Sequence, residues 1–241
     1  MWAVIPAAGR ASRLHSVTGG GPKALLEVGG RTLLDWLLLR LAGPVTDVCL
    51  VVDDLGGPIA RSVGSERHGI RVHFAVQPSP KGVGDAVLRA ADRVDAAFFA
   101  VMGDVYYDQA LGTYIDAWRR SDAEGAVLIQ RFPEPPSQPM GLVELKGDLV
   151  VGAKKTVFRG RGLTGVCGAA ILPERVFEAA SALGPSDAAE LELEDIIGWL
   201  IRERGARFLA LPYRGWRRNI NTADDLRQVR EHHARRRGKR T

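Results

Sequence analysis

Short apolar runs alternate with longer amphipathic stretches through the first half of the chain. The apolar runs predict strands at Ala3–Pro6, Val48–Val52, Val72–Val76, Ala97–Met102 and Ala126–Gln130. Apolar residues at helical spacing predict helices between them, at Thr32–Leu41, Ile59–Glu66, Asp85–Arg93 and Leu111–Ser121. The alternation predicts an α/β fold: a Rossmann-like, doubly wound domain with a mostly parallel sheet that also accommodates antiparallel strands.

The pattern changes after Arg131, where a proline-rich stretch interrupts it. Short strand-like runs follow and predict a small β-rich lobe over the sheet, at Gly141–Leu145, Leu149–Val151 and Gly165–Leu172. The remaining elements are a helix at Glu192–Arg204, a strand at Phe208–Pro212 and a last helix from Thr222 to about Arg235. We therefore predict one domain over residues 1–234, divided into a first half at 1–131, the lobe and return at 132–215, and a final segment and helix at 216–234.

Composition fits an enzyme-sized domain. The 241 residues are 46% apolar, which is enough to bury a substantial core. Cys49 and Cys167 lie inside apolar runs, as reduced core cysteines do, and no signal peptide or membrane-spanning stretch is found. We therefore expect a cytoplasmic protein that does not associate with membranes.

The net charge of +5 does not by itself indicate a nucleic-acid partner. Five basic residues at the C-terminus account for it: Arg235, Arg236, Arg237, Lys239 and Arg240. We predict a solvated, disordered tail at 235–241, with polyanion binding as the alternative. No nucleic acid is expected as a partner, and the chain is expected to be a monomer or a homodimer.

The first predicted strand runs into a turn of small residues, at Ala7, Ala8, Gly9, Ala11 and Ser12. Arg13 follows this turn, and Pro22-Lys23 comes shortly after. Small residues let backbone N–H groups approach an anion, and the two cations neutralise its charge. The segment therefore predicts a loop that binds a polyphosphate such as a nucleoside triphosphate. The alternative is an ordinary strand–turn–helix connection.

Two more segments follow predicted strands. Gln77 offers a donor and an acceptor to a nucleobase edge, and Gly82, before Val83, lets the backbone lie against a ring. Asp104 ends an apolar strand, and a single carboxylate suffices for Mg²⁺ because this ion takes most of its ligands from phosphates and water. The alternatives are a surface loop at 76–86 and a turn or cap role for Asp104.

The opening loop resembles the signature of the sugar-1-phosphate nucleotidylyltransferases, G-x-G-T-R-L-x-P-x-T-x-x-x-P-K. The spacing from Gly9 to Lys23 is kept without a gap, with Ala11, Ser12 and Ser16 in place of Gly, Thr and Pro. Ser12 keeps the hydroxyl, whereas a Cβ at Ala11 narrows the approach of a phosphate. The resemblance implies a GT-A-like nucleotidyltransferase fold.

The base-reading segment is similar to the V-Q-P-S-P-x-G-L-A-Q-A stretch of glucose-1-phosphate thymidylyltransferases. Gly84-Asp85 is closer to the pattern of uridylyltransferases, such as the N-terminal domain of the N-acetylglucosamine-1-phosphate enzymes. UTP, dTTP and CTP therefore all stay open as the nucleotide. The resemblance implies contacts with the base from Gln77, Gly82 and Val83.

The resemblance also implies a second metal ligand far along the chain. Residues 216–226 resemble the family's W-x-D-x-x-T-x-x-D-L ending, in which the Asp completes the metal site. Asn219 aligns with that Asp, and Asn221 points to the same side if the segment is extended. Either amide is a candidate ligand beside Asp104. Thr222 is also predicted to be the N-cap of the last helix, with Asp225 three residues on.

On the acceptor side, Leu163–Val166 resembles a segment that lines the family's sugar pocket, which implies acceptor contacts from Thr164 and Gly165, and from Gly141. Lys154 and Lys155 stand where the family often has Glu-Lys, the Glu for sugar hydroxyls and the Lys for the sugar phosphate. Lys155 fits the second role. Lys154 replaces the carboxylate, which points to an acceptor other than an ordinary neutral hexose phosphate, or to two exposed hairpin lysines.

The helix predicted at 192–204 begins after a run of acids. Glu190–Ile196 resembles the family's E-L-E-I-T-D stretch. These carboxylates are interpreted either as favourable charges at a helix N-terminus or as site residues.

The implied reaction is attack of an acceptor phosphate oxygen on the α-phosphorus of a nucleoside triphosphate, with pyrophosphate leaving. Arg13 is assigned to the β- and γ-phosphates, Lys23 to the α-phosphate and Lys155 to the acceptor phosphate. Asp104 and one Asn would hold Mg²⁺. The alternatives are a cytidylyltransferase for a non-sugar phosphate or phosphonate, and a non-catalytic nucleotide-binding regulator, which Ala11 and Asn219 would favour.

Overall fold

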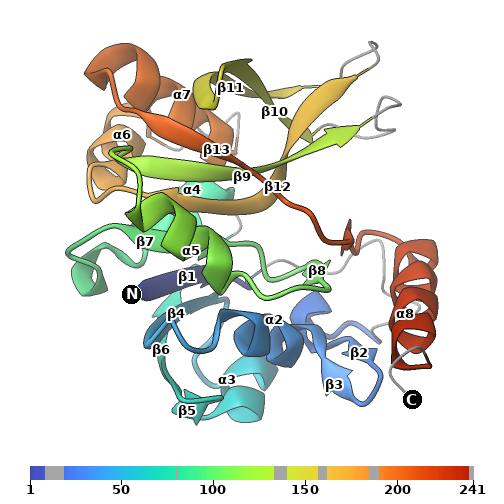
Figure 1. Cartoon of the computed structure of the whole chain (residues 1–241). Helices are drawn as coiled ribbons and strands as arrows, with labels where there is room; N and C mark the ends of the chain where they lie inside the picture. Colours follow the sequence, from blue (N-terminus) through green and yellow to red (C-terminus); the bar gives the residue numbers. More distant parts are fainter. Residues whose placement is uncertain (9–18, 80, 133–139, 157–161, 185–189, 239–241) are drawn as a thin grey trace.

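A mixed sheet of ten strands forms the centre of the protein (Figure 1). The computed structural model describes residues 1–8, 19–79, 81–132, 140–156, 162–184 and 190–238. From one edge to the other, the strands are β10 (Met140–Lys146), β11 (Leu149–Thr156), β13 (Phe208–Pro212), β9 (Gly125–Phe132), β12 (Leu163–Leu172), β7 (Phe98–Val101), β1 (Trp2–Pro6), β4 (Asp47–Val52), β6 (Ile70–Val76) and β5 (Glu66–Arg67).

Four strands of the first half, β7, β1, β4 and β6, run parallel and confirm the predicted alternation. Helices α2 (Leu33–Leu41), α3 (Pro58–Val63) and α5 (Gly112–Arg119) supply the apolar layer on one face of the sheet. Helices α4 (Val83–Leu88), α6 (Val176–Leu183) and α7 (Leu193–Arg204) supply the layer on the other. Because both faces are covered, the central strands are apolar at almost every position.

Two predicted helices are shorter than expected. Helix α3 ends at Val63 because Gly64 adopts a φ of +75°, and Glu66–Arg67 then form β5. In place of one helix at 85–93, α4 begins directly after Gly82 and a separate turn, η3 (Ala91–Arg93), follows it.

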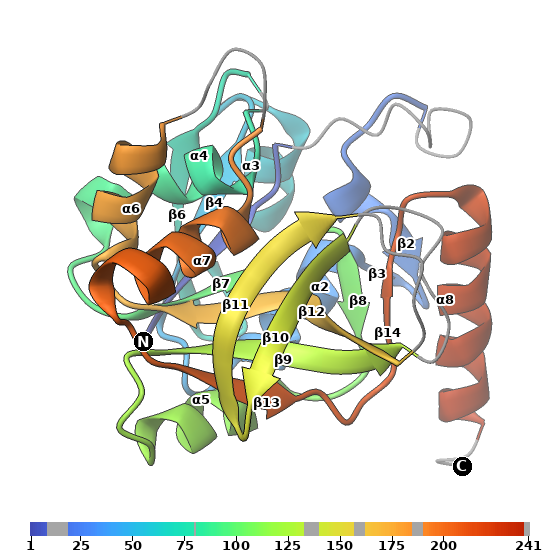
Figure 2. The same ribbon diagram turned by 90° about the horizontal axis from the view of Figure 1, so that it is seen from above.

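The predicted β-rich lobe is the curled end of the same sheet. Strand β12 is antiparallel to both β7 and β9, so it continues the sheet from the parallel half. Strand β10 pairs with β11 and also with β12, through Leu142 and Gly165. Figure 2 shows β10 and β11 crossing over β9 and β12 as a result.

A short ribbon lies beside the sheet. Strand β8 (Val105–Tyr107) pairs antiparallel with β14 (Arg217–Asn219), and α8 (Ala223–Arg237) follows. The predicted N-cap of α8 is confirmed, since the Thr222 hydroxyl accepts from Asp225 N at 3.2 Å. Beneath α8 lie a turn, η2 (Lys23–Leu25), and a hairpin of β2 (Glu27–Val28) and β3 (Arg31–Thr32).

The last helix extends beyond its predicted end. It continues through Arg237, so Arg235–Arg237 are helical and do not belong to a disordered tail. Contacts with Asp108 stabilise this longer helix. The buried carboxylate of Asp108 forms an ion pair with Arg236 and lies 3.0 Å from His232 Nε2, and both partners belong to α8. No helix in the described ranges combines the length and apolar character needed to cross a membrane.

Asp35 ties the outer strand β5 to helix α2. Its buried carboxylate accepts from Arg67 Nε at 2.6 Å, Arg31 Nη1 at 2.8 Å and His68 Nε2 at 2.9 Å. Burial alone raises the pKa of Asp35, but these three hydrogen bonds outweigh it and lower the pKa to about 2.

Replacing Asp35 should therefore have a pH-dependent cost. A carboxyl whose pKa falls on folding stabilises the protein above its unfolded pKa near 4, and this stability is lost as the pH falls towards 2. Asp35→Asn should lower the free energy of unfolding by about 2 kcal/mol at pH 7, and the deficit should disappear near pH 2. Urea unfolding at pH 7, 4 and 2.5 measures this. The exposed Asp116→Asn is the control, and a deficit that stayed constant with pH would contradict the assignment.

Candidate active site

Three residues from distant parts of the sequence meet at one edge of the sheet. Lys23 Nζ, on the turn η2, donates to Asn221 Oδ1 at 2.9 Å and to Asp104 Oδ2 at 3.4 Å. The side chains of Lys23 and Asp104 are 17% and 28% exposed, so the ion pair is shielded and still open to a ligand. The cation and two oxygen ligands predicted for one site thus lie together.

A close approach of two backbones positions Asp104. Strand β7 ends at Val101, and Gly103 N donates to Pro6 O, at the end of β1, at 3.3 Å. A Cβ at Gly103 would lie 2.9 Å from that same oxygen, so a side chain there would push the strands apart. Asp104 consequently begins beside Ala7 and Ala8, both buried at the start of the predicted phosphate loop.

The rest of the predicted phosphate loop lies outside the residues that the structure describes. Gly9, Ala11, Ser12 and Arg13 fall within residues 9–18, which the described ranges do not include.

The two candidate amides have different partners. Asn219 Oδ1 accepts from Arg217 Nη1 at 2.6 Å, whereas Asn221 Oδ1 accepts from Lys23. Pairing of β14 with β8 sets this arrangement, because Ile220 N donates to Asp104 O at 3.0 Å. Asn221 therefore shares a donor with Asp104, and the oxygen of Asn219 is already engaged.

The segment predicted to read a base is packed tightly. Gln77 is buried, and its Nε2 donates to Asp85 Oδ2 at 2.8 Å and to Gly82 O at 3.1 Å. Gly82 adopts a φ of +95°, and a Cβ there would lie 2.5 Å from Leu191 O, which explains the glycine. Val83 then begins α4. The donor end of the Gln77 amide is thus used within the protein.

The predicted acceptor residues lie on three neighbouring strands at the curled end of the sheet. Gly141 pairs with Lys155 across β10 and β11, and Leu142 pairs with both Lys154 and Gly165. Thr164 directly precedes Gly165 on β12. Gly165 has a packing reason as well, because a Cβ there would collide with Met140 and lie 2.9 Å from Phe132.

Lys155 forms an ion pair with Glu192, at the start of α7. Partial burial lowers the pKa of Lys155, but the hydrogen bond that Lys155 donates to Glu192 and the negative charges of Glu192, Glu194 and Glu190 together outweigh burial and raise the pKa. Lys154 is exposed. The two lysines therefore differ, and only Lys155 has an acidic partner within the described residues.

Glu194 was not among the predicted site residues, although its acidic run was singled out. Its carboxyl lies against Gly141, where a Cβ would collide with it. Burial raises the pKa of Glu194 to about 7, and the neighbouring Glu192 adds to the shift. A protonatable acid thus faces β10 at Gly141, one of the predicted acceptor residues.

Arg217 is a second residue that sequence reasoning missed. Its guanidinium lies 5.6 Å from the centre of the Phe132 ring, and its Nη2 donates to Val166 O at 3.4 Å. Its Nε is buried and has no partner among the residues that the structure describes. A buried donor of this kind is costly unless a ligand completes it.

Hard oxygen ligands are available for a cation. The Asp104 carboxylate and the Asn221 amide oxygen both lie around Lys23 Nζ, whereas in the described ranges no three His, Cys, Asp or Glu side chains cluster. One carboxylate and one amide oxygen fit Mg²⁺ that takes its other ligands from phosphates and water.

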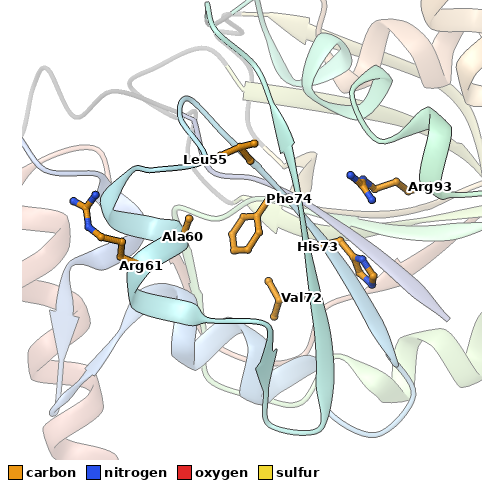
Figure 3. Close-up of a pocket in the computed structure, with 7 residues that line it drawn as sticks. All are labelled: Leu55, Ala60, Arg61, Val72, His73, Phe74 and Arg93. Atoms are coloured by element: carbon orange, nitrogen blue, oxygen red, sulfur yellow. The ribbon is translucent and has the colours of Figure 1, made fainter.

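A hollow of about 580 Å³ lies away from these residues, beside β6 and α3 (Figure 3). Phe74, Val72 and Leu55 line it, with Arg61 and Arg93 at its margins. It holds none of the predicted site residues that the structure describes.

Comparisons with known proteins point to one family. The family described as Nucleotidyl transferase matches residues 2–159. The chain is 27% identical over 234 residues to glucose-1-phosphate thymidylyltransferase of Streptomyces griseus, covering 95% of this chain and 65% of that protein. It is 26% identical over 228 residues to UTP–glucose-1-phosphate uridylyltransferase AglF of Haloferax volcanii, covering 93% of each. The chain thus spans just under two thirds of the Streptomyces protein.

Solved structures share the fold. A Bacillus anthracis structure in complex with a sucrose has a TM-score of 0.86 at 22% identity, covering 97% of this chain and 95% of its own. The inositol-1-phosphate CTP transferase of T. maritima has a TM-score of 0.79 at 17% identity, covering 97% and 94%. These matches support a mixed α/β fold with a central mixed sheet.

The raised pKa of Glu194 has a measurable consequence. A carboxyl whose pKa rises on folding stabilises the protein below its unfolded pKa, and this stability is lost as the pH rises towards 7. Glu194→Gln removes that loss, so its stability relative to wild type should increase by about 2 kcal/mol between pH 5.5 and pH 8. Urea unfolding at both pH values tests this, with the exposed Glu231→Gln as the control. Equal differences at both pH values would contradict a raised pKa.

Proposed function

The chain belongs to the nucleotidyl transferase family, and from this premise we propose that it joins a nucleoside triphosphate to a sugar 1-phosphate. The products are a nucleoside diphosphate sugar and pyrophosphate. The observation that carries the proposal is Lys23 Nζ donating to both Asn221 and Asp104 at the sheet edge. The parallel half of the sheet supports the finer description of a Rossmann-like, GT-A-like fold, with the ligand at the carboxyl ends of the strands.

The chemistry requires charge stabilisation and positioning. An oxygen of the acceptor phosphate is already anionic, so it attacks the α-phosphorus without a general base, and pyrophosphate leaves in line. Lys23 stabilises the charge on the α-phosphate, because its ammonium is held between the oxygens of Asp104 and Asn221 at the edge of the sheet. Arg13 is assigned to the β- and γ-phosphates.

We assign a Mg²⁺ site to Asp104 and Asn221. When bound there, the ion would supply Lewis-acid charge to the phosphates. Asn221 is preferred over Asn219 because its amide oxygen lies with the Asp104 carboxylate around Lys23 Nζ, whereas the Asn219 oxygen accepts from Arg217.

The acceptor side combines cations with one protonatable acid. Lys155 and Arg217 are assigned to the acceptor phosphate, since Glu192 holds the first and the second has a buried Nε that no described residue contacts as a hydrogen-bond partner. Glu194 provides a carboxyl for acceptor hydroxyls beside Gly141, in place of the acid that Lys154 replaces. The nucleotide stays one of UTP, dTTP or CTP, because Gln77 uses its donor within the protein and leaves the carbonyl for the base.

One observation favours a second candidate function. Lys154 stands where the family often has a sugar-binding Glu, so a cation takes the place of that carboxylate. Transfer of a cytidylyl group from CTP to a non-sugar phosphate fits this change of charge, and one of the structurally similar proteins is named an inositol-1-phosphate CTP transferase. Non-catalytic nucleotide binding is the remaining alternative.

A pyrophosphate-release screen tests the function. UTP, dTTP and CTP are crossed with sugar 1-phosphates, polyol phosphates and phosphonates. We expect release with one triphosphate and a sugar 1-phosphate. Release only with a polyol phosphate or phosphonate would support the second candidate, and nucleotide binding without release for any pair would contradict catalysis.

The cations of the loop are tested on the active pair from that screen. Lys23→Met and Arg13→Ala should each lower kcat by about 10²-fold, because each removes one charge that stabilises the transition state. Lys146→Met, at an exposed position on β10, is the matched control. Near wild-type turnover in both loop variants would overturn the assigned roles.

The metal assignment predicts unequal effects of the two amides. Asn221→Ala should raise the Mg²⁺ concentration needed for half-maximal turnover about tenfold, since one oxygen ligand is lost. Asn219→Ala should leave that concentration near its wild-type value. A Mg²⁺ titration of turnover measures both, and the reverse order would move the ligand to Asn219.

A further inference from the structure

A cavity of about 540 Å³ lies between α2 and α8. Its walls come from α2, from the hairpin of β2 and β3, from β8 and from α8. Tyr106 of β8 lines it, whereas the neighbouring residues Val105 and Tyr107 belong to the apolar core of the sheet. The cavity includes none of the residues assigned to nucleotide, metal or acceptor.

The cavity carries surplus positive charge. Four arginines line it, Arg31, Arg40, Arg236 and Arg237, against one carboxylate, Asp108. Arg236 pairs with Asp108, and Arg31 pairs with Asp35 outside the cavity. Within the described ranges no carboxylate forms an ion pair with Arg40 or Arg237. Two guanidinium groups are therefore available to a ligand.

The arginines are held in place before any ligand arrives. The guanidinium of Arg40 lies 5.3 Å from the centre of the Trp36 ring, and that of Arg31 lies 5.6 Å from it. Arg40 Nε also donates to Tyr107 O at 3.3 Å. The Trp36 ring, the Tyr107 carbonyl and a hydrogen bond with the Tyr106 side chain hold Arg40 at the wall of the cavity.

The positive charge of the cavity also affects His233. The ring is buried, and its Nδ1 lies 3.0 Å from the Tyr106 hydroxyl. Burial lowers the pKa of His233, and the charges of Arg237 and Arg40 lower it further. The lowered pKa disfavours the charged form of His233, so the surplus positive charge of the cavity comes from the arginines.

We propose that this cavity binds a small organic molecule that carries a phosphate group. Guanidinium groups match the geometry of phosphate oxygens, and two unpaired ones match its double charge. The volume falls in the range of small-molecule pockets and exceeds what inorganic phosphate fills. Trp36 and Leu39 supply an apolar wall for the organic part. The basic end of α8, predicted as a solvated tail, thereby forms part of a binding site.

Calorimetric titration of the full chain with phenyl phosphate and with inorganic phosphate tests the proposal without any assay of turnover. Arg40→Met combined with Arg237→Met should weaken phenyl phosphate binding at least about tenfold, because two charge-assisted contacts are lost. Arg227→Met is the matched control, since Arg227 lies on the same helix and pairs with Asp224 and Glu231. Wild type should bind phenyl phosphate more tightly than inorganic phosphate.

Lys23→Met separates this cavity from the active site, and its binding of phenyl phosphate should match wild type. Equal weakening in the Arg227 variant, loss in the Lys23 variant, or no effect of the double variant would each overturn the proposal. The same holds if a DNA duplex binds through Arg40 and Arg237 while phenyl phosphate does not. Arg237→Met alone, at the exposed last residue of α8, serves if the double variant fails to fold.

Discussion

The pairing of β14 with β8 is the contact on which the candidate active site depends. It joins segments far apart in the chain, with Asn219 opposite Val105 and Ile220 N donating to Asp104 O at 3.0 Å. Without this pairing, Asn221 would have no fixed position beside Asp104. Asp108 connects the ribbon to α8. Trp216 N donates to its Oδ1 at 2.9 Å, and His232 of α8 contacts its Oδ2 at 3.0 Å.

The ends of β1 and β7 position the start of the β8–β14 ribbon. Parallel strands β1 and β7 end side by side, and the close approach of Gly103 to Pro6 places the following residue, Asp104, at the end of β1. Lys23 then reaches both Asp104 and Asn221 from a short turn. Because these strands run parallel, their carboxyl ends lie at the same edge of the sheet, and the side chains that follow them can act on one ligand. The curled end of the sheet adds the strands that carry Gly141, Lys155 and Gly165.

Sequence patterns predicted the long elements well and the short ones poorly. Buried strands such as β4 are apolar throughout and are easily recognised, whereas β8 and β14 are three residues each and leave no periodic signal. Lys23, Asp104 and the two asparagines were identified from motifs and from the family resemblance, and three of them, Lys23, Asp104 and Asn221, lie together in the structure. Which asparagine lies beside Asp104 depends on Arg217, a contact made through tertiary structure. Glu194 was missed for a similar reason, since only the packing of α7 against β10 shows that it is buried.

Replacing a second carboxylate by amides changes the electrostatics of the proposed reaction. Lys23 forms an ion pair with Asp104, and Arg217 donates to Asn219, so a cation lies beside the carboxylate and beside one of the amides before any metal binds. A nucleoside triphosphate therefore meets less repulsion than it would between two carboxylates. The same substitution weakens the protein's own hold on a divalent cation, because an amide oxygen carries only a partial charge. In such a site the phosphates supply most of the ligand charge, and the cation is expected to enter with the nucleotide.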